Sequence, residues 1–258
     1  MIDCHAHISH SIFDQDRKKV INQAQRAGVK TIIAVGEDID DSRLVLEMCR
    51  KYPGVLLPCM GIHPDAFAED RKAPSDVDIV NIITLIQENR KDLFCIGEVG
   101  LDYRVVRSEK RRLKQRAFLS QMVDLSNELS LPLNVHCRSA GHYTLDLLAR
   151  CNAEKVLMHA FDGRASYAMQ VFKDRRWIFS IPPSIVRSSQ KQKLVKTLPL
   201  DALALESDSP ALGPDPRIRN EPANLVHVVR SIAKIKRETE EKVRNITTQN
   251  AQKLFGLD

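Results

Sequence analysis

Six residues whose side chains bind metal ions stand at the predicted ends of β-strands, although they are spread along most of the chain. They are His5, His7, Glu98, His136, His159 and Asp208. Imidazole and carboxylate groups are ligands for borderline and hard divalent ions. A set rich in histidine, with one carboxylate left over to bridge, is typical of a hydrolytic centre. The sequence therefore predicts a polynuclear metal site and hydrolysis by a metal-activated water.

Two local patterns strengthen this prediction. A strand places alternate residues on the same face, so His5 and His7 can point the same way and share one ion. Glu98 ends the apolar run Cys95-Ile96-Gly97, where a buried carboxylate needs a cation or several donors to offset its lost hydration. A salt bridge remains the alternative for Glu98, and a helix cap or turn remains the alternative for Asp208.

The elements that must position these residues follow a regular alternation of apolar runs and amphipathic stretches. Strands are expected at residues 2–4, 30–35, 55–60, 93–97, 133–136, 155–159, 177–181 and 203–206. Helices are expected at residues 17–27, 42–51, 77–89, 108–129, 143–150, 166–173, 188–197 and 223–235. This order predicts an α/β fold, a single (β/α)8 TIM barrel, with a doubly wound open sheet as the alternative.

Such a barrel would bring the six candidate ligands together. They follow strands one, four, five, six and eight, and barrel enzymes place their chemistry where the strands end. Residues 238–255 add one further helix at the C-terminus. With 258 residues and no repeat or linker, we expect one hydrolase domain over residues 1–258.

The composition bounds the class of protein. Hydrophobic residues make up 43% and charged residues 28%, which is ordinary for a globular chain. No apolar run approaches the roughly 18 residues of a membrane span, and we expect no signal peptide before the first strand. The six cysteines form no CxxC spacing, and Cys4, Cys59 and Cys95 fall in expected strands. We expect reduced thiols and an intracellular, cytoplasmic or nuclear, location without a membrane partner.

Charged residues divide the expected barrel mouth into two halves. The loops after strands one to three are acidic, as in residues 37–41, whereas the later loops carry Arg187, Arg217 and Arg219. The net charge of +6 also favours an anionic partner. We therefore expect a polyanion to bind these three arginines. Ordinary solvated loop charges are the alternative.

Seven segments, taken in order over residues 2–257, carry a family resemblance. They are residues 5–7, 60–64, 97–103, 131–138, 159–163, 206–210 and 219–222. The block Gly-Glu-Val-Gly-Leu-Asp-Tyr is the longest and most specific of them. Together they resemble the TatD family of metal-dependent deoxyribonucleases, which are TIM-barrel hydrolases of the amidohydrolase type. The chain departs from the family pattern at Ala160-Phe161-Asp162 and at Glu206-Ser207-Asp208, and neither departure removes a ligand.

The resemblance implies a centre with two divalent metal ions per chain, bridged by Glu98. His5, His7 and Asp208 would bind one ion, and His136 and His159 would bind the other. It also implies that His63 lies near the substrate. Zinc fits the histidine ligands best, and magnesium or manganese can be the working ion of a nuclease.

A mechanism follows from the two charges. Two ions about 3.5–4 Å apart hold a hydroxide between them and stabilise the entering and leaving oxygens of a phosphodiester displacement. Asp208 is expected to accept the proton of this nucleophile, and Glu98 to set the spacing of the ions. His63 and Arg138 are expected to neutralise the scissile phosphate, and Tyr103 is a further candidate contact to the substrate.

Three functions fit these residues. The first is a DNA exonuclease that acts on single-stranded ends, with no obligate protein partner. The alternative is a binuclear hydrolase of an ester or amide, such as an aminoacyl linkage, because the same activated water attacks phosphoryl and acyl centres alike. A non-catalytic metal-stabilised binding protein is disfavoured, since no ligand is missing from the set.

Overall fold

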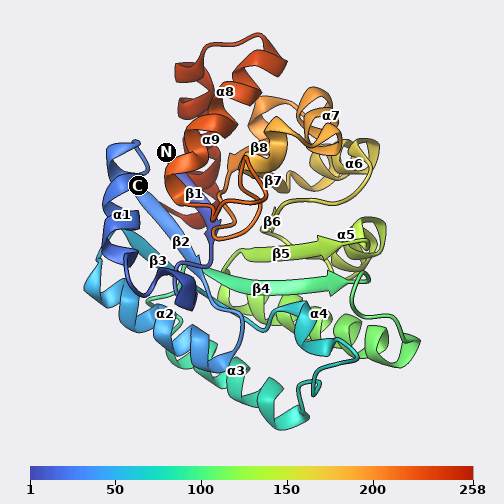
Figure 1. Ribbon diagram of the computed structural model, residues 1–258. Helices are drawn as coiled ribbons and strands as arrows, with labels where there is room; N and C mark the ends of the chain where they lie inside the picture. The colour runs from blue at the N-terminus through green and yellow to red at the C-terminus, as the bar shows by residue number, and fades with distance from the viewer. Residues whose placement is uncertain (258) are drawn as a thin grey trace.

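The computed structural model describes residues 1–257, and within them eight parallel strands lie side by side in sequence order. The strands are β1 (Ile2–Ala6), β2 (Thr31–Val35), β3 (Leu56–Met60), β4 (Cys95–Asp102), β5 (Leu133–Arg138), β6 (Val156–Met158), β7 (Ile178–Ile181) and β8 (Leu203–Leu205). A doubly wound sheet reverses its strand order at one point, and this sheet does not. The predicted (β/α)8 barrel is therefore confirmed, and Figure 1 shows its strands inside a ring of helices.

Backbone hydrogen bonds connect the first strand to the segment that follows the last one. The amide of Asp208 donates to the carbonyl oxygen of His5 at 2.9 Å, and the amide of His7 donates to that of Ser209 at 2.8 Å. The buried carboxylate of Asp3 also accepts the amide of Ser207 at 2.8 Å. These bonds close the barrel and hold three candidate ligands next to one another.

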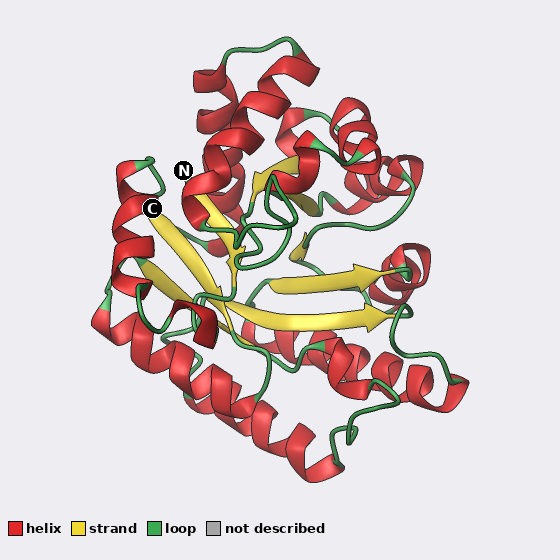
Figure 2. Cartoon of the chain, viewed as in Figure 1, coloured by secondary structure: helices red, strands yellow, loops and turns green. Residues whose placement is uncertain are grey.

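Helices cover the outside of the barrel, and loops join the elements at its two ends (Figure 2). The helices are α1 (Arg17–Arg26), α2 (Ile39–Lys51), α3 (Asp76–Glu88), α4 (Glu109–Leu129), α5 (Gly141–Arg150), α6 (Ala165–Arg175), α7 (Ser189–Thr197), α8 (Leu225–Lys236) and α9 (Glu240–Phe255). Short 3-10 turns lie at Ser11–Phe13, Pro64–Phe67, Pro183–Val186, Leu200–Ala202 and Pro222–Asn224. The predicted extra helix is α9, which packs against α8 and β8.

Polar caps explain why several helices begin close to their predicted starts. The hydroxyl of Ser188 accepts the amide of Lys191 at the start of α7, and Thr239 does the same for Lys242 at the start of α9. Each cap satisfies an amide that has no partner inside its helix.

Three strands extend past their predicted ends. β4 continues to Asp102, and β1 and β5 continue to Ala6 and Arg138. His5, Glu98 and His136 therefore lie inside strands, so their predicted place at strand ends was wrong. The pairing of strands is irregular at two of them: the register of β1 on β2 shifts between Asp3 and Ala6, around His5, and that of β4 on β5 shifts between Ile96 and Val99, around Glu98.

Two glycines let β4 approach β5 around Glu98. A Cβ atom on Gly97 would lie 2.5 Å from the carbonyl oxygen of Asn134, and one on Gly100 would lie 2.0 Å from that of His136. Both glycines also have positive φ, +155° and +148°, which side chains disfavour. The block around Glu98 thus needs glycine on both sides of the carboxylate.

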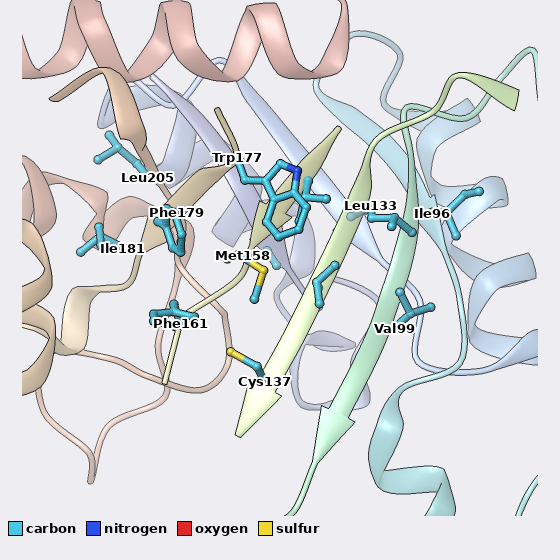
Figure 3. Close-up of a cluster of buried hydrophobic side chains, with 14 of the residues drawn as sticks. Ile96, Val99, Leu133, Cys137, Met158, Phe161, Trp177, Phe179, Ile181 and Leu205 are labelled. Carbon is cyan, nitrogen blue, oxygen red and sulfur yellow. The ribbon is translucent and has the colours of Figure 1, made fainter. Parts of the chain in front are cut away.

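Apolar side chains fill the space along β4 to β8 (Figure 3). Trp177 is fully buried and donates to the carbonyl oxygen of Ala153 at 3.2 Å. Phe161 and Phe179 meet edge to face at 5.3 Å. The cysteines are free thiols, and within residues 1–257 no helix is long and apolar enough to cross a membrane.

Candidate metal centre

The structure brings all six predicted ligands together at the mouth of the barrel. Five of them are buried and His136 is partly exposed. His5, Glu98 and His136 point inward from β1, β4 and β5, whereas His159 and Asp208 lie just beyond β6 and β8. Asp208 adopts a left-handed backbone conformation, φ +53°, which aspartate tolerates better than most residues.

Four ligand atoms form a compact group that we call the first subsite. They are Nε2 of His5, Nε2 of His7, Oε2 of Glu98 and Oδ1 of Asp208. The two imidazole nitrogens lie 3.2 Å from each other. Oε2 of Glu98 lies 3.2 Å from that of His5 and 3.3 Å from that of His7, and Oδ1 of Asp208 lies 3.7 Å from each of them. Ligands about 2.0–2.1 Å from a tetrahedral zinc ion lie roughly 3.3–3.4 Å apart. The first subsite therefore has the dimensions of a tetrahedral metal site.

The other oxygen of Glu98 faces a second group of imidazoles, the second subsite. Its Oε1 lies 2.7 Å from Nδ1 of His136, 3.9 Å from Nε2 of His159 and 3.5 Å from Nε2 of His63. Glu98 is thus shared between two clusters of nitrogen donors. The spacing is less even here, because His136 and Glu98 are hydrogen-bonded.

Buried acceptors fix which nitrogen of each imidazole faces the centre. Nδ1 of His5 lies 2.9 Å from Oδ1 of Asn134, and Nδ1 of His159 lies 2.8 Å from Oε2 of Glu206. When these nitrogens carry the proton, Nε2 is left as an unprotonated donor toward the centre. Such outer partners orient ligands and raise their basicity.

His136 has the opposite orientation. Its Nε2 lies 3.3 Å from the carboxylate of Asp102, so Nδ1 is the atom that faces Glu98. Asp102 is held in turn by the guanidinium of Arg138 at 2.7 Å. Although burial alone would raise the pKa of Asp102, His136 and Arg138 hold it at about 2.

The centre concentrates negative charge that requires cations. Burial alone would raise the pKa of Glu98, but the facing imidazoles of His63 and His5 hold it well below its usual range. Burial alone would lower the pKa of His5, but Glu98 and Asp208 outweigh this and raise it to about 10. In the metal-free chain, the raised pKa of His5 therefore favours a proton on this imidazole, which partly balances the buried carboxylates.

The donor set fits divalent metal ions. Oε2 of Glu98 is buried and accepts no hydrogen bond, although two imidazole nitrogens lie within 3.3 Å. An unpaired buried carboxylate oxygen is costly unless a cation or donor faces it. A cation with nitrogen and oxygen ligands at this position would satisfy all four groups at once.

Comparisons with known proteins identify the family of this chain. The family model of the TatD related DNases matches residues 2–256. The chain belongs to the TatD-related DNase family. It is 44% identical to the human protein named deoxyribonuclease TATDN3, over 99% of this chain and 94% of that one. The predicted family is confirmed, and so is the prediction that the chain is a hydrolase.

Two other relatives extend the comparison. A Salmonella typhimurium protein named 3'-5' ssDNA/RNA exonuclease TatD is 31% identical over all of this chain and 99% of its own length. A Bacillus subtilis protein described as a metal-dependent hydrolase is 32% identical over the full length of both. The crystal structure of the Escherichia coli TatD homologue YjjV has a TM-score of 0.90 at 23% identity, covering 100% of this chain and 98% of that one. That likeness establishes the fold.

The candidate metal centre opens into a cleft of about 340 Å³. Arg138, Arg187 and Asp208 are among its lining residues. His63 is not part of this lining but lies 3.5 Å from Glu98 and pairs with Asp65 at 2.8 Å. Three of the predicted substrate residues, His63, Arg138 and Arg187, are thus adjacent to the ligands.

The other three predicted substrate residues are placed differently. Tyr103 is buried beside β4, and its hydroxyl accepts from Arg116 at 2.9 Å. Arg217 is largely exposed and pairs with Asp215. Arg219 connects the two halves of the mouth, because it pairs with Asp16 from the β1 side and with Glu221, each at 2.7 Å. The structure does not bring these three side chains to the ligands.

Sequence reasoning missed the residues that hold the ligands. Glu206 accepts the hydroxyl of Ser180 at 2.5 Å and the amide of Ala160 at 2.9 Å, in addition to its contact with His159. Lys191 is buried and donates to the carbonyl oxygens of Ala160 and Phe161 at 2.6 and 2.8 Å. Glu206 carried the same signal as Glu98, a carboxylate at the end of an apolar strand, whereas Lys191 gave none.

Proposed function

We propose that this TatD-family chain is a metal-dependent nuclease that hydrolyses phosphodiester bonds in DNA, as an exonuclease acting on single-stranded ends. One observation carries the proposal: the two oxygens of Glu98 face two separate groups of imidazoles. A carboxylate shared in this way suits a pair of ions, and two-metal sites are common in nucleases and phosphatases. The names of the human and Salmonella relatives support DNA as the substrate.

The proposal assigns two divalent ions to the chain. His5, His7 and Asp208 would hold one ion, His136 and His159 the other, and Glu98 both. Bound there, such ions supply Lewis acidity and lower the pKa of a coordinated water. Zinc suits the nitrogen donors, and magnesium or manganese can support activity.

The side chains around the ligands have their own tasks. Asp208 lines the cleft and would take up the proton of the attacking water at its carboxylate. His63 lies with Nε2 3.5 Å from Glu98 and Nδ1 2.8 Å from Asp65, and in this proposal its imidazole would contact a phosphate oxygen near the ligands. Arg138, half exposed beside Asp102, would bind the same phosphate from the other side.

The remaining parts of the proposal come from the sequence. In this proposal residues 1–258 form one hydrolase domain. An intracellular location, cytoplasmic or nuclear, stays a prediction. No obligate protein partner is assigned. Of the DNA contacts expected from the sequence, Arg187 is kept in this proposal because it lines the cleft. Arg217, Arg219 and Tyr103 have partners within the protein and are not assigned to the substrate.

Metal reconstitution tests the proposal. The purified chain is stripped with a chelator, reloaded with zinc, magnesium or manganese, and incubated with single-stranded DNA labelled at one end. We expect stepwise release of nucleotides only after reloading. Release of an amino acid from an aminoacyl substrate, with intact DNA in the same preparation, would support the alternative ester or amide hydrolase and contradict the nuclease.

A further inference from the structure

Four aromatic side chains form a continuous row at the end of the barrel where the candidate ligands lie. In order they are Tyr103, Tyr143, His142 and Tyr167, and we call them the aromatic row. Ring centroids lie 5.3 Å apart between the first two, 5.9 Å between the next two and 5.0 Å between the last two. The row crosses three elements that are far apart in the sequence, so helical periodicity does not explain it.

The row lies at the same end of the barrel as the ligands. Tyr103 directly follows β4, which carries Glu98. His142 and Tyr143 lie in the first turn of α5, after β5 and His136, and Tyr167 lies in the first turn of α6, after His159. Figure 1 shows α5 at the arrowheads of β4 and β5. Each member thus follows a candidate ligand by only a few residues.

The rings are available to a partner. Tyr143 is 57% exposed and Tyr167 is 38% exposed, and His142 is also exposed. Tyr103 is buried and supports the row from below, because the guanidinium of Arg112 lies 4.3 Å from its ring centroid and Arg116 donates to its hydroxyl. Exposed tyrosine rings at a barrel mouth leave an apolar face open to a partner and are typical of binding surfaces.

Positive charge accompanies the row. Arg164 lies over the ring of Tyr167 at 5.9 Å. Neither Arg164 nor Arg112 forms an ion pair with a carboxylate within residues 1–257. The nearby acidic groups are already engaged: Glu109 pairs with Arg116, and Asp162 accepts the amide of Ser139 at 2.9 Å.

We propose that the aromatic row is a stacking platform for the bases of a single-stranded nucleic acid whose end lies in the metal centre. This inference rests on the proposed nuclease function and adds the path of the strand. Every base has a π face, so aromatic side chains bind bases without regard to sequence, and nearby arginines bind the backbone. The bases of a duplex are already stacked on one another, so the row selects single strands.

Tyrosine variants separate stacking from other roles. Binding of labelled oligothymidylate with a phosphorothioate backbone, which resists hydrolysis, is measured by fluorescence anisotropy on the metal-loaded enzyme. We expect Tyr143→Ala with Tyr167→Ala to weaken binding by about tenfold or more, the scale of base stacking on aromatic rings. The matched variant, Tyr143→Phe with Tyr167→Phe, keeps both ring faces and should bind like the wild type.

An abasic strand gives the decisive control. An oligonucleotide of the same length with tetrahydrofuran in place of every base keeps the phosphates and loses the rings that stack. Wild type and the alanine variant should bind it equally weakly. Equal binding of oligothymidylate by wild type and the alanine variant would overturn the proposal, whether or not the variant changes its oligomeric state.

A second assay separates failure of the stacking platform from failure of the proposed nuclease function. Hydrolysis of bis(p-nitrophenyl) phosphate, which has no base to stack in a row, is measured in parallel. The alanine variant should retain this activity. If strand binding depends on the tyrosines but the chain cleaves no DNA, the stacking platform is supported and the nuclease function is contradicted. If the chain cleaves DNA and the tyrosine variants cleave it equally well, the nuclease function is supported and the stacking platform is contradicted.

Discussion

The two subsites differ in how their geometry is built. In the first, the ligand atoms already lie 3.2–3.7 Å apart, and backbone hydrogen bonds between the ends of β1 and the segment after β8 hold His5, His7 and Asp208. In the second, Glu98 and His136 are hydrogen-bonded at 2.7 Å while His159 lies 3.9 Å away. An ion that enters the first subsite displaces the 3.2 Å contact between the imidazoles of His5 and His7. An ion that enters the second must displace the shorter hydrogen bond between His136 and Glu98 and also draw His159 closer. We therefore expect the first subsite to bind metal more tightly.

The largest effect should come from the one residue that belongs to both subsites. Glu98→Ala removes the shared anion, so two like charges would face each other without compensation. We expect loss of most bound metal from both subsites and loss of hydrolysis, measured as ions per chain and as nucleotide release. Retention of full activity by a folded Glu98→Ala protein would contradict its role.

Asp208→Asn tests the first subsite alone. The amide keeps an oxygen ligand but cannot accept a proton at neutral pH. Part of the metal should remain, while turnover should fall by about two or more orders of magnitude, the scale of general base removal. Equal losses of metal and turnover would instead make Asp208 only a ligand.

Much of this centre could be predicted from the sequence, but not the part that makes the subsites differ. The six ligands were readable because each is a polar residue inside an apolar strand or shortly after one. Their partners were not, because Asn134 and Glu206 act through contacts between β1, β5, β6 and the end of β8, and only the folded barrel brings these together. The end of β4 was also predicted wrongly, because Glu98 was placed at the end of an apolar run, whereas the strand continues to Asp102.

These partners allow the subsites to be perturbed one at a time. Glu206→Gln weakens the orientation of His159 and should reduce affinity for the second ion by about 10–100-fold, the usual cost of losing an outer partner. One ion per chain should stay bound. Asn134→Leu is the matched change on His5 and should weaken the first ion instead. Stepwise metal titration of both variants would test the pairing, and identical titrations would end the distinction between the subsites.

The smallest effects are expected for two arginines, Arg187 and Arg219, that the sequence analysis placed together as contacts of a polyanion. Arg187 lines the cleft and has no carboxylate partner within residues 1–257, whereas Arg219 is held by Asp16 and Glu221. We expect Arg187→Glu to flatten the dependence of log kcat/KM on log salt by about 0.7, the value for one phosphate contact on a single strand. Arg219→Ala should leave this slope unchanged and lower Tm by at most about 2–4 °C, because it loosens the loop beside the first subsite. A flattened slope in Arg219→Ala would instead place the strand across both halves of the mouth and make Arg219 the phosphate contact expected from its sequence.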